Sequence, residues 1–218
     1  MNPQDGALVI AQPASSDQLV LMFHGMGSSP GDLAPLGATL ARVRPRATVV
    51  SVQAPHASQM GRGWEWFSVA GITEANRPQR IAQAMPLFLQ AIAHWQGVSG
   101  IGPDRTALVG FSQGAIMSLE STQSGLSPQP AAHTLIAMAG RLAEPARRAL
   151  AGVRVHLIHG EEDSIVPARC SVQAEGELRA LGGEVTLDLV PGLGHGIDAR
   201  VLGLVVERLA GVLQVRAD

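Results

Sequence analysis

The sequence lacks most features of extracellular and membrane proteins. Its single cysteine, Cys170, cannot form a disulfide within the chain, which favours a reducing compartment. Residues 1–5 have no basic segment followed by an apolar one, so we expect no signal peptide. No apolar run is long enough to span a membrane. These absences together predict a cytoplasmic protein.

Charge is also scarce. Charged residues make up 16% of the chain, and 16 basic against 18 acidic residues leave a net charge of −2. Because no basic field exists to attract phosphates, we expect no nucleic-acid partner. Hydrophobic residues reach 46% of 218 residues, which is enough for a sizeable core. With no repeat, low-complexity tract or linker, the sequence predicts a single domain over residues 1–218.

Apolar segments typical of strands alternate with segments of helical periodicity. This alternation predicts an α/β fold with a mostly parallel, twisted sheet and helices on both faces. The expected strands lie at residues 18–23, 47–52, 106–109, 133–139, 153–159 and 184–190. The expected helices lie at residues 33–43, 78–95, 115–120, 168–181 and 197–213.

Three local patterns add detail. Residues 6–11 and 18–23, separated by a turn-type cluster, predict a hairpin. Asp32 stands where a helix N-cap belongs. Pro86, inside the expected helix 78–95, predicts a kink or a broken start.

Ser112 lies in a G-x-S-x-G sequence between an expected strand and an expected helix. That context is the one a nucleophile elbow requires, with the serine at the tip of a strained turn. Gly110 and Gly114 flank it because a Cβ there would collide with the adjoining strand and helix. In a chain with 25 glycines the motif can easily occur by chance, so the prediction depends on its position between a strand and a helix.

The segment 24–32 is a glycine-rich loop between an expected strand and helix. A dinucleotide site is disfavoured, because Pro30 replaces the third glycine of that pattern and the strand 47–52 lacks a following acid. The alternative is a loop whose backbone N–H groups face a developing negative charge, where Gly25 and Gly27 allow close approach.

A nucleophilic serine needs a base, and the base needs an orienting acid. In α/β-hydrolases the acid and then the histidine follow the serine, each after a strand. Asp163 and His195 fit that order, although Glu161 and Glu162 compete with Asp163.

A metal site is not expected. His156 and His159, three apart on one strand, face opposite sides and cannot form a metal-binding pair. No H-E-x-x-H motif occurs, and we expect neither a metal nor an organic cofactor.

Residues 53–77 are irregular and concentrate aromatic side chains, which make up only 3% of the chain. Trp64, Trp66 and Phe67 either form an apolar wall for a substrate or anchor the loop to the sheet. Both uses bury aromatic area, and the loop's length favours the functional one, with Trp66 nearer to substrate than Trp64.

Taken together, these segments resemble the phospholipase/carboxylesterase family of α/β-hydrolases, which includes acyl-protein thioesterases. The matching segments, in family order, are His24–Ser28 with Asp32 and Leu33, Gly110–Ala115, His159–Pro167 and Gly192–His195. Residues 62–73 further resemble a bacterial esterase branch, although Ser68 stands where many relatives have an aspartate.

The resemblance implies an α/β-hydrolase fold and specific roles. Ser112 would be the nucleophile, Asp163 the orienting acid and His195 the base. The backbone N–H groups of Met26 and Gln113 would form the oxyanion hole. The implied activity is hydrolysis of small carboxylic esters, thioesters or lysophospholipids through an acyl-enzyme.

Two other functions stay open at this stage. One is a non-catalytic ligand-binding protein on the same fold, since folds host many functions. The other is an acyltransferase or perhydrolase, which shares the acyl-enzyme but not the attacking group. The sequence does not separate these readings and does not give the oligomeric state.

Overall fold

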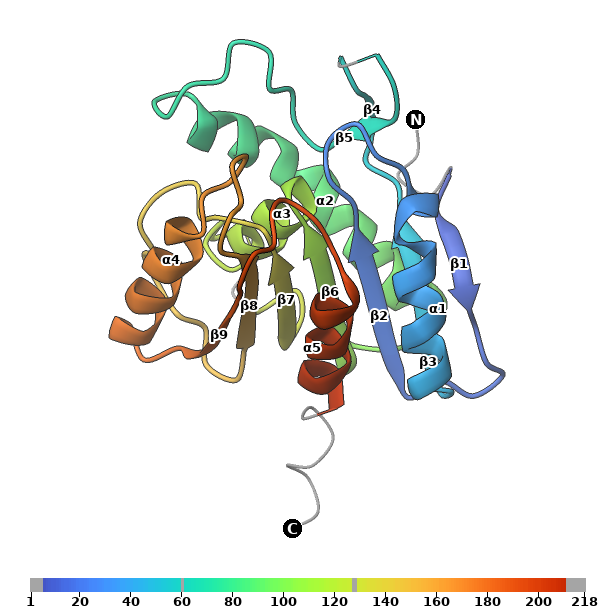
Figure 1. Cartoon of the computed structure of the whole chain (residues 1–218). Helices are drawn as coiled ribbons and strands as arrows, with labels where there is room; N and C mark the ends of the chain where they lie inside the picture. Colours follow the sequence, from blue (N-terminus) through green and yellow to red (C-terminus); the bar gives the residue numbers. More distant parts are fainter. Residues whose placement is uncertain (1–5, 60, 127–128, 211–218) are drawn as a thin grey trace.

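A seven-stranded sheet forms the centre of the computed structural model, which describes residues 6–59, 61–126 and 129–210 (Figure 1). The order across the sheet is β1-β3-β2-β6-β7-β8-β9, and all neighbours are parallel except β1 and β3. The strands are β1 (Leu8–Ala11), β2 (Gln18–Phe23), β3 (Ala47–Val52), β6 (Thr106–Phe111), β7 (Thr134–Met138), β8 (Arg154–Gly160) and β9 (Glu184–Val190). Two short strands, β4 (His56–Ala57) and β5 (Trp64–Glu65), pair separately.

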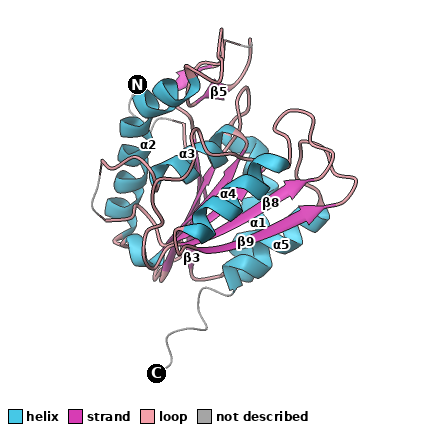
Figure 2. Ribbon diagram, turned by 90° about the vertical axis from the view of Figure 1, so that its left-hand side faces the viewer, coloured by secondary structure: helices cyan, strands magenta, loops and turns pink. Residues whose placement is uncertain are grey.

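Helices cover both faces of this sheet (Figures 1 and 2). On one face α1 (Ala34–Val43) and α5 (Ala199–Ala210) bury leucines and valines such as Leu40 and Val205. On the other face lie α2 (Arg77–Ser99), α3 (Gln113–Ser121) and α4 (Arg169–Ala180), which contribute Phe88, Met117 and Leu178 to a second core. The predicted fold class is therefore confirmed. Residues 211–213 of the expected last helix lie outside the described residues.

The predicted hairpin is wrong. β1 pairs with β3 in antiparallel fashion, and β3 lies between β1 and β2. Burial explains this order: every residue of β2 and β3 is buried, so both strands need neighbours on each side. β1 is exposed or half-buried throughout and suits the edge of the sheet.

Two further local predictions also need correction. Ser29, and not Asp32, precedes the short 3₁₀ helix η1 (Pro30–Leu33), and the Asp32 carboxylate accepts a hydrogen bond from the backbone N–H of Ser29 at 2.9 Å. Pro86 does not interrupt α2, which continues from residue 77 to residue 99 with Pro78 in its first turn. A second short 3₁₀ helix, η2 (Pro103–Arg105), leads into β6.

The C-terminal ends of parallel strands lie on the same side of a sheet, so the loops that follow β2, β6, β8 and β9 gather on that side. Ser112, Asp163 and His195 belong to these loops, and so does the glycine-rich segment that starts at His24. The topology thus brings distant segments of the chain together at the C-terminal ends of the strands.

Candidate active site

Ser112 forms a sharp turn between β6 and α3. Its φ of 52° and ψ of −116° lie outside the usual regions for a residue with a side chain, as predicted for an elbow. The turn is tight on both sides: a Cβ on Gly114 would lie 2.0 Å from the carbonyl oxygen of Phe23, and one on Gly110 would lie 2.5 Å from Ala115 N. The glycines therefore permit the close packing that presents the serine.

The three side chains singled out from the sequence meet in one hydrogen-bonded chain. Ser112 Oγ lies 3.0 Å from His195 Nε2. His195 Nδ1 lies 2.6 Å from Asp163 Oδ2. The His195 ring also packs against Phe111, with ring centroids 5.0 Å apart. The serine, the imidazole and the carboxylate come from loops after β6, β9 and β8, as their order in the sequence requires.

The Asp163 carboxylate is buried and well satisfied. Its Oδ1 accepts the backbone N–H groups of Ile165 and Val166, both at 2.9 Å. Burial alone would raise the pKa of Asp163, but the hydrogen bond from His195 and those from the two amides outweigh it and lower the pKa. Glu161 and Glu162 are exposed. The geometry therefore separates Asp163 from its two acidic neighbours.

A second histidine that sequence reasoning missed touches the same carboxylate. His159 is buried, and its Nε2 lies 3.3 Å from Asp163 Oδ2 and 2.7 Å from the carbonyl oxygen of Val166. Both partners are acceptors, so this nitrogen carries a proton. Its position in the motif His159-Gly160-x-x-Asp163 was the available signal, because the motif brings the ring back to the acid four residues later.

The glycine-rich loop after β2 lies directly beside the serine. A Cβ on Gly25 would be 3.1 Å from Ser112 Cβ. His24 fixes this loop: its Nε2 accepts the N–H of Ala54 at 3.1 Å, so its Nδ1 carries the proton that it donates to Gly25 O at 2.7 Å. Burial lowers the pKa of His24 and keeps the ring neutral.

The backbone N–H groups of Met26 and Gln113 have no hydrogen-bond acceptor within the described part of the chain. Both residues line the pocket that contains Ser112. Two unused donors in the same pocket as a serine hydroxyl form an arrangement that can accept a developing oxyanion.

Hydrogen bonds join the aromatic segment after residue 63 to Gln113, which follows Ser112, and to the glycine-rich loop after β2. Gln113 Oε1 accepts the N–H of Trp66 at 2.9 Å, and Gln113 Nε2 donates to Phe67 O at 2.8 Å. Trp66 Nε1 donates to His24 O at 3.1 Å. Trp64 pairs with Ser28 through its backbone N–H. The clamp made by the Gln113 side chain was not foreseen from the sequence.

A pocket of about 160 Å³ opens beside Ser112. Phe67 lines it, but Trp64 and Trp66 do not, and Trp66 is 1% exposed within the core. Trp66 therefore anchors the segment in the core, whereas we expected it to lie nearer to substrate than Trp64. The sequence did not single out six other lining residues as part of the pocket: Val69, Ile72, Arg77, Ile116, Arg141 and Ile165.

The described residues contain no group of three or more His, Cys, Asp and Glu side chains that could hold a metal. His156 and His159 have different partners, Thr186 and Ser171, in keeping with their opposite directions on β8. Among the helices that the structure describes, none is long and apolar enough to cross a membrane.

The fold and the Ser–His–Asp geometry define the α/β-hydrolase class. Comparison with known sequences identifies the family within this class. The profile of the Phospholipase/Carboxylesterase family matches residues 4–213, so the chain belongs to that family. It is 41% identical over 207 residues to Esterase YpfH of Escherichia coli (strain K12), covering 94% of this chain and 87% of that protein. The chain is accordingly a hydrolytic enzyme, and carboxylesterase activity is supported.

Solved structures of esterases have the same fold as this chain. The crystal structure of esterase PE8 superposes with a TM-score of 0.81 at 32% identity, covering 91% of this chain and 94% of that one. A Bacillus cereus carboxylesterase superposes with a TM-score of 0.78 over 94% and 93% of the two chains. Its identity of 18% makes it evidence for the fold alone.

Proposed function

We propose that the protein is a serine carboxylesterase in which Ser112, His195 and Asp163 act as a catalytic triad. The observation that carries this proposal is the unbroken chain of contacts, 3.0 Å from serine to imidazole and 2.6 Å from imidazole to carboxylate. Ser112 attacks the ester carbonyl while His195 Nε2 takes its proton. His195 returns that proton to the leaving alcohol, and a water activated by His195 then releases the acid.

The oxyanion formed in both steps accepts hydrogen bonds from Met26 N–H and Gln113 N–H. His24 and the Gln113 side chain support this role, because they fix the two loops that carry the donors. Donors already in position need no reorganisation when charge develops, and removing one such donor in comparable sites costs roughly 10²–10³ in rate.

The substrates we propose are small carboxylic esters whose acyl or alcohol group lies against Phe67, Val69 and Ile72 in the pocket. Thioesters and lysophospholipids react through the same acyl-enzyme and are finer possibilities. Every step uses side chains, amides and water, so the mechanism requires neither a metal nor an organic cofactor. We place this activity in a single domain spanning the chain.

The test is labelling with a fluorophosphonate probe, combined with hydrolysis of para-nitrophenyl esters. The wild-type protein should be labelled once, at Ser112, and Ser112→Ala should abolish labelling and lower the rate by roughly 10⁴–10⁶. Ser118, a buried serine on helix α3, which follows Ser112, supplies a matched control as Ser118→Ala. Turnover by folded Ser112→Ala at the wild-type rate would refute the nucleophile. Absence of labelling in the wild type would favour a non-catalytic binding protein.

A further inference from the structure

Two arginine side chains stand among the mostly apolar residues that line the pocket beside Ser112. Arg77 lies at the start of α2, and Arg141 follows β7; both line this pocket. Of the described residues, no carboxylate lines it with them. An apolar acyl or alcohol group makes no use of two cations, and placing such a group against them would remove water from the charges at a cost in free energy.

The two arginines share one carboxylate at the rim. Arg141 Nη2 donates to Glu74 Oε2 at 2.9 Å, Arg141 Nη1 lies 3.3 Å from Glu74 Oε1, and Arg77 Nη1 donates to the same Oε1. Two positive groups and one negative group leave one unit of positive charge. In the described part of the chain, the Nε and Nη2 atoms of Arg77 have no acceptor. The pair thus already binds a carboxylate and keeps donors for another.

Exposure differs sharply among the three side chains. The arginine side chains are 16% and 25% exposed, whereas that of Glu74 is 70% exposed. Glu74 is therefore on the solvent side, and a carboxylate that enters from the pocket meets the guanidinium groups from within. It can join Glu74 or take its place.

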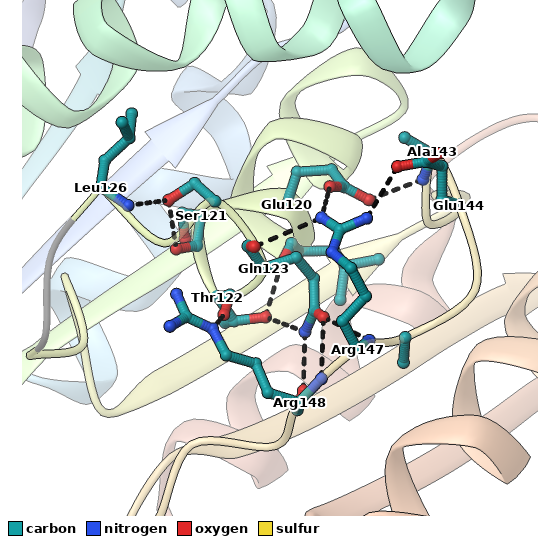
Figure 3. A network of polar contacts seen from close by, with 12 residues as sticks. Glu120, Ser121, Thr122, Gln123, Leu126, Ala143, Glu144, Arg147 and Arg148 are labelled. Atoms are coloured by element: carbon teal, nitrogen blue, oxygen red, sulfur yellow. Dashed lines mark hydrogen bonds and ion pairs between the residues drawn. The ribbon is translucent and has the colours of Figure 1, made fainter.

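The segment that carries Arg141 is fixed to the helix of the elbow (Figure 3). The N–H of Ala143 donates to the buried Glu120 carboxylate at 2.6 Å, and the N–H of Arg147 donates to Gln123 Oε1 at 2.9 Å. Glu120 belongs to α3, and Gln123 lies just beyond its end. Because α3 begins directly after Ser112, the network fixes this segment relative to the serine, and a preorganised donor loses less entropy on binding.

We propose that the preferred substrate is an ester that bears a second, ionised carboxylate, and that Arg77 and Arg141 bind this carboxylate. The inference rests on the proposed esterase function and adds the substrate class. A carboxylate is favoured because its oxygens match the planar fork of a guanidinium, as the Arg141–Glu74 pair illustrates. The carboxylate can belong to the acyl part or to the alcohol part of the ester.

The experiment compares kcat/KM for charged and neutral esters of equal length. On the acyl side the pair is mono-para-nitrophenyl glutarate and para-nitrophenyl pentanoate. On the alcohol side it is para-carboxyphenyl pentanoate and phenyl pentanoate. The ratio of charged to neutral kcat/KM is measured for the wild type and for Arg77→Gln, Arg141→Gln and Glu74→Gln. Arg105→Gln is the matched control, because Arg105 is exposed and lies directly before β6, at the N-terminal ends of the strands and away from the pocket.

For one of the two pairs, the ratio should fall at least about tenfold in Arg77→Gln and Arg141→Gln, mainly through KM, since a lost charge-assisted hydrogen bond has that magnitude. Arg141→Lys keeps the charge without the fork, so its ratio should be intermediate. Glu74→Gln should raise the ratio, because it removes the competing carboxylate. Added salt should lower the wild-type ratio. Arg105→Gln should leave it unchanged.

Ratios within twofold of the wild type in all the Arg77 and Arg141 variants, for both pairs, would overturn this inference. If Arg77→Gln does not fold, the two Arg141 variants decide. The outcome is separable from the esterase proposal: wild-type turnover of the neutral esters that depends on Ser112 keeps that proposal intact, whatever the ratios are.

Discussion

Replacing Trp66 by alanine should destabilise the fold without changing which esters are preferred. Trp66 is 1% exposed and packs against Phe23 and Phe88, with ring centroids 5.6 and 5.1 Å away. Truncating a buried tryptophan of this kind costs about 4 kcal/mol. For a chain of this size, each kcal/mol shifts Tm by about 2–4 °C, so the expected loss is about 8–16 °C. Trp66→Phe keeps most of the ring but leaves His24 O without its donor, which should cost about 1–2 kcal/mol.

The assay pairs thermal unfolding, followed by circular dichroism, with kcat/KM for esters of graded acyl length. Phe67→Ala is the matched comparison, because Phe67 is the neighbouring aromatic residue and lines the pocket. It should shift the chain-length profile through KM, whereas the Trp66 variants should lower Tm and leave the profile in place. The reasoning fails if Trp66→Ala melts within about 2 °C of the wild type, or if it alters the length profile as much as Phe67→Ala does.

Two other predictions concern acid–base groups. Asp163→Asn should lower kcat by about 10⁴, because an amide NH₂ toward His195 Nδ1 leaves a proton on Nε2, and Glu162→Gln should be nearly neutral; the reverse order in a steady-state assay would contradict the acid assignment. Burial lowers the pKa of His156 from 6.5 to about 4. Between these values the unfolded chain binds a proton that the folded chain does not. The free energy of unfolding therefore decreases as the pH is lowered from 6.5 toward 4, by at most about 3 kcal/mol and by less where solvent screens the charge. His156→Gln should flatten this part of the profile in urea unfolding at about pH 7 and pH 4.5, with His24 leaving a smaller slope, and an unchanged profile would contradict it.

The sequence predicted the central strands well because parallel strands buried on both faces are continuously apolar. Every residue of β6 except the last is buried, and β7 is buried throughout, so no polar residue obscures their boundaries. The partner of a strand is not written in its own residues. Pairing of β1 with β3 depends on how many neighbours each strand needs, which only the assembled sheet decides.

The hydrogen-bonded residues of the site were predictable for a related reason. A tight turn that exposes a serine demands glycine at fixed offsets, since a Cβ at position 114 would lie 2.0 Å from Phe23 O. Asp163 and His195 likewise sit in short motifs that follow strands. Such residues leave a local signature because the backbone beside them is constrained. The outcome for Asp163 also shows what spacing misses: its burial, which separates it from Glu162, is a property of the folded chain.

The pocket walls carry no comparable signature. Arg77 begins an ordinary helix and Arg141 follows an ordinary strand, 64 residues later in the chain, and nothing local distinguishes them from solvated arginines. They become neighbours only because Glu74 lies between them and because the segment of Arg141 is fastened to the end of α3. Chemistry that needs a particular backbone shape can therefore be found in the sequence, while specificity built from side chains on unconstrained backbone needs the fold. The reaction that we propose belongs to the first kind, and the choice of substrate that we propose belongs to the second.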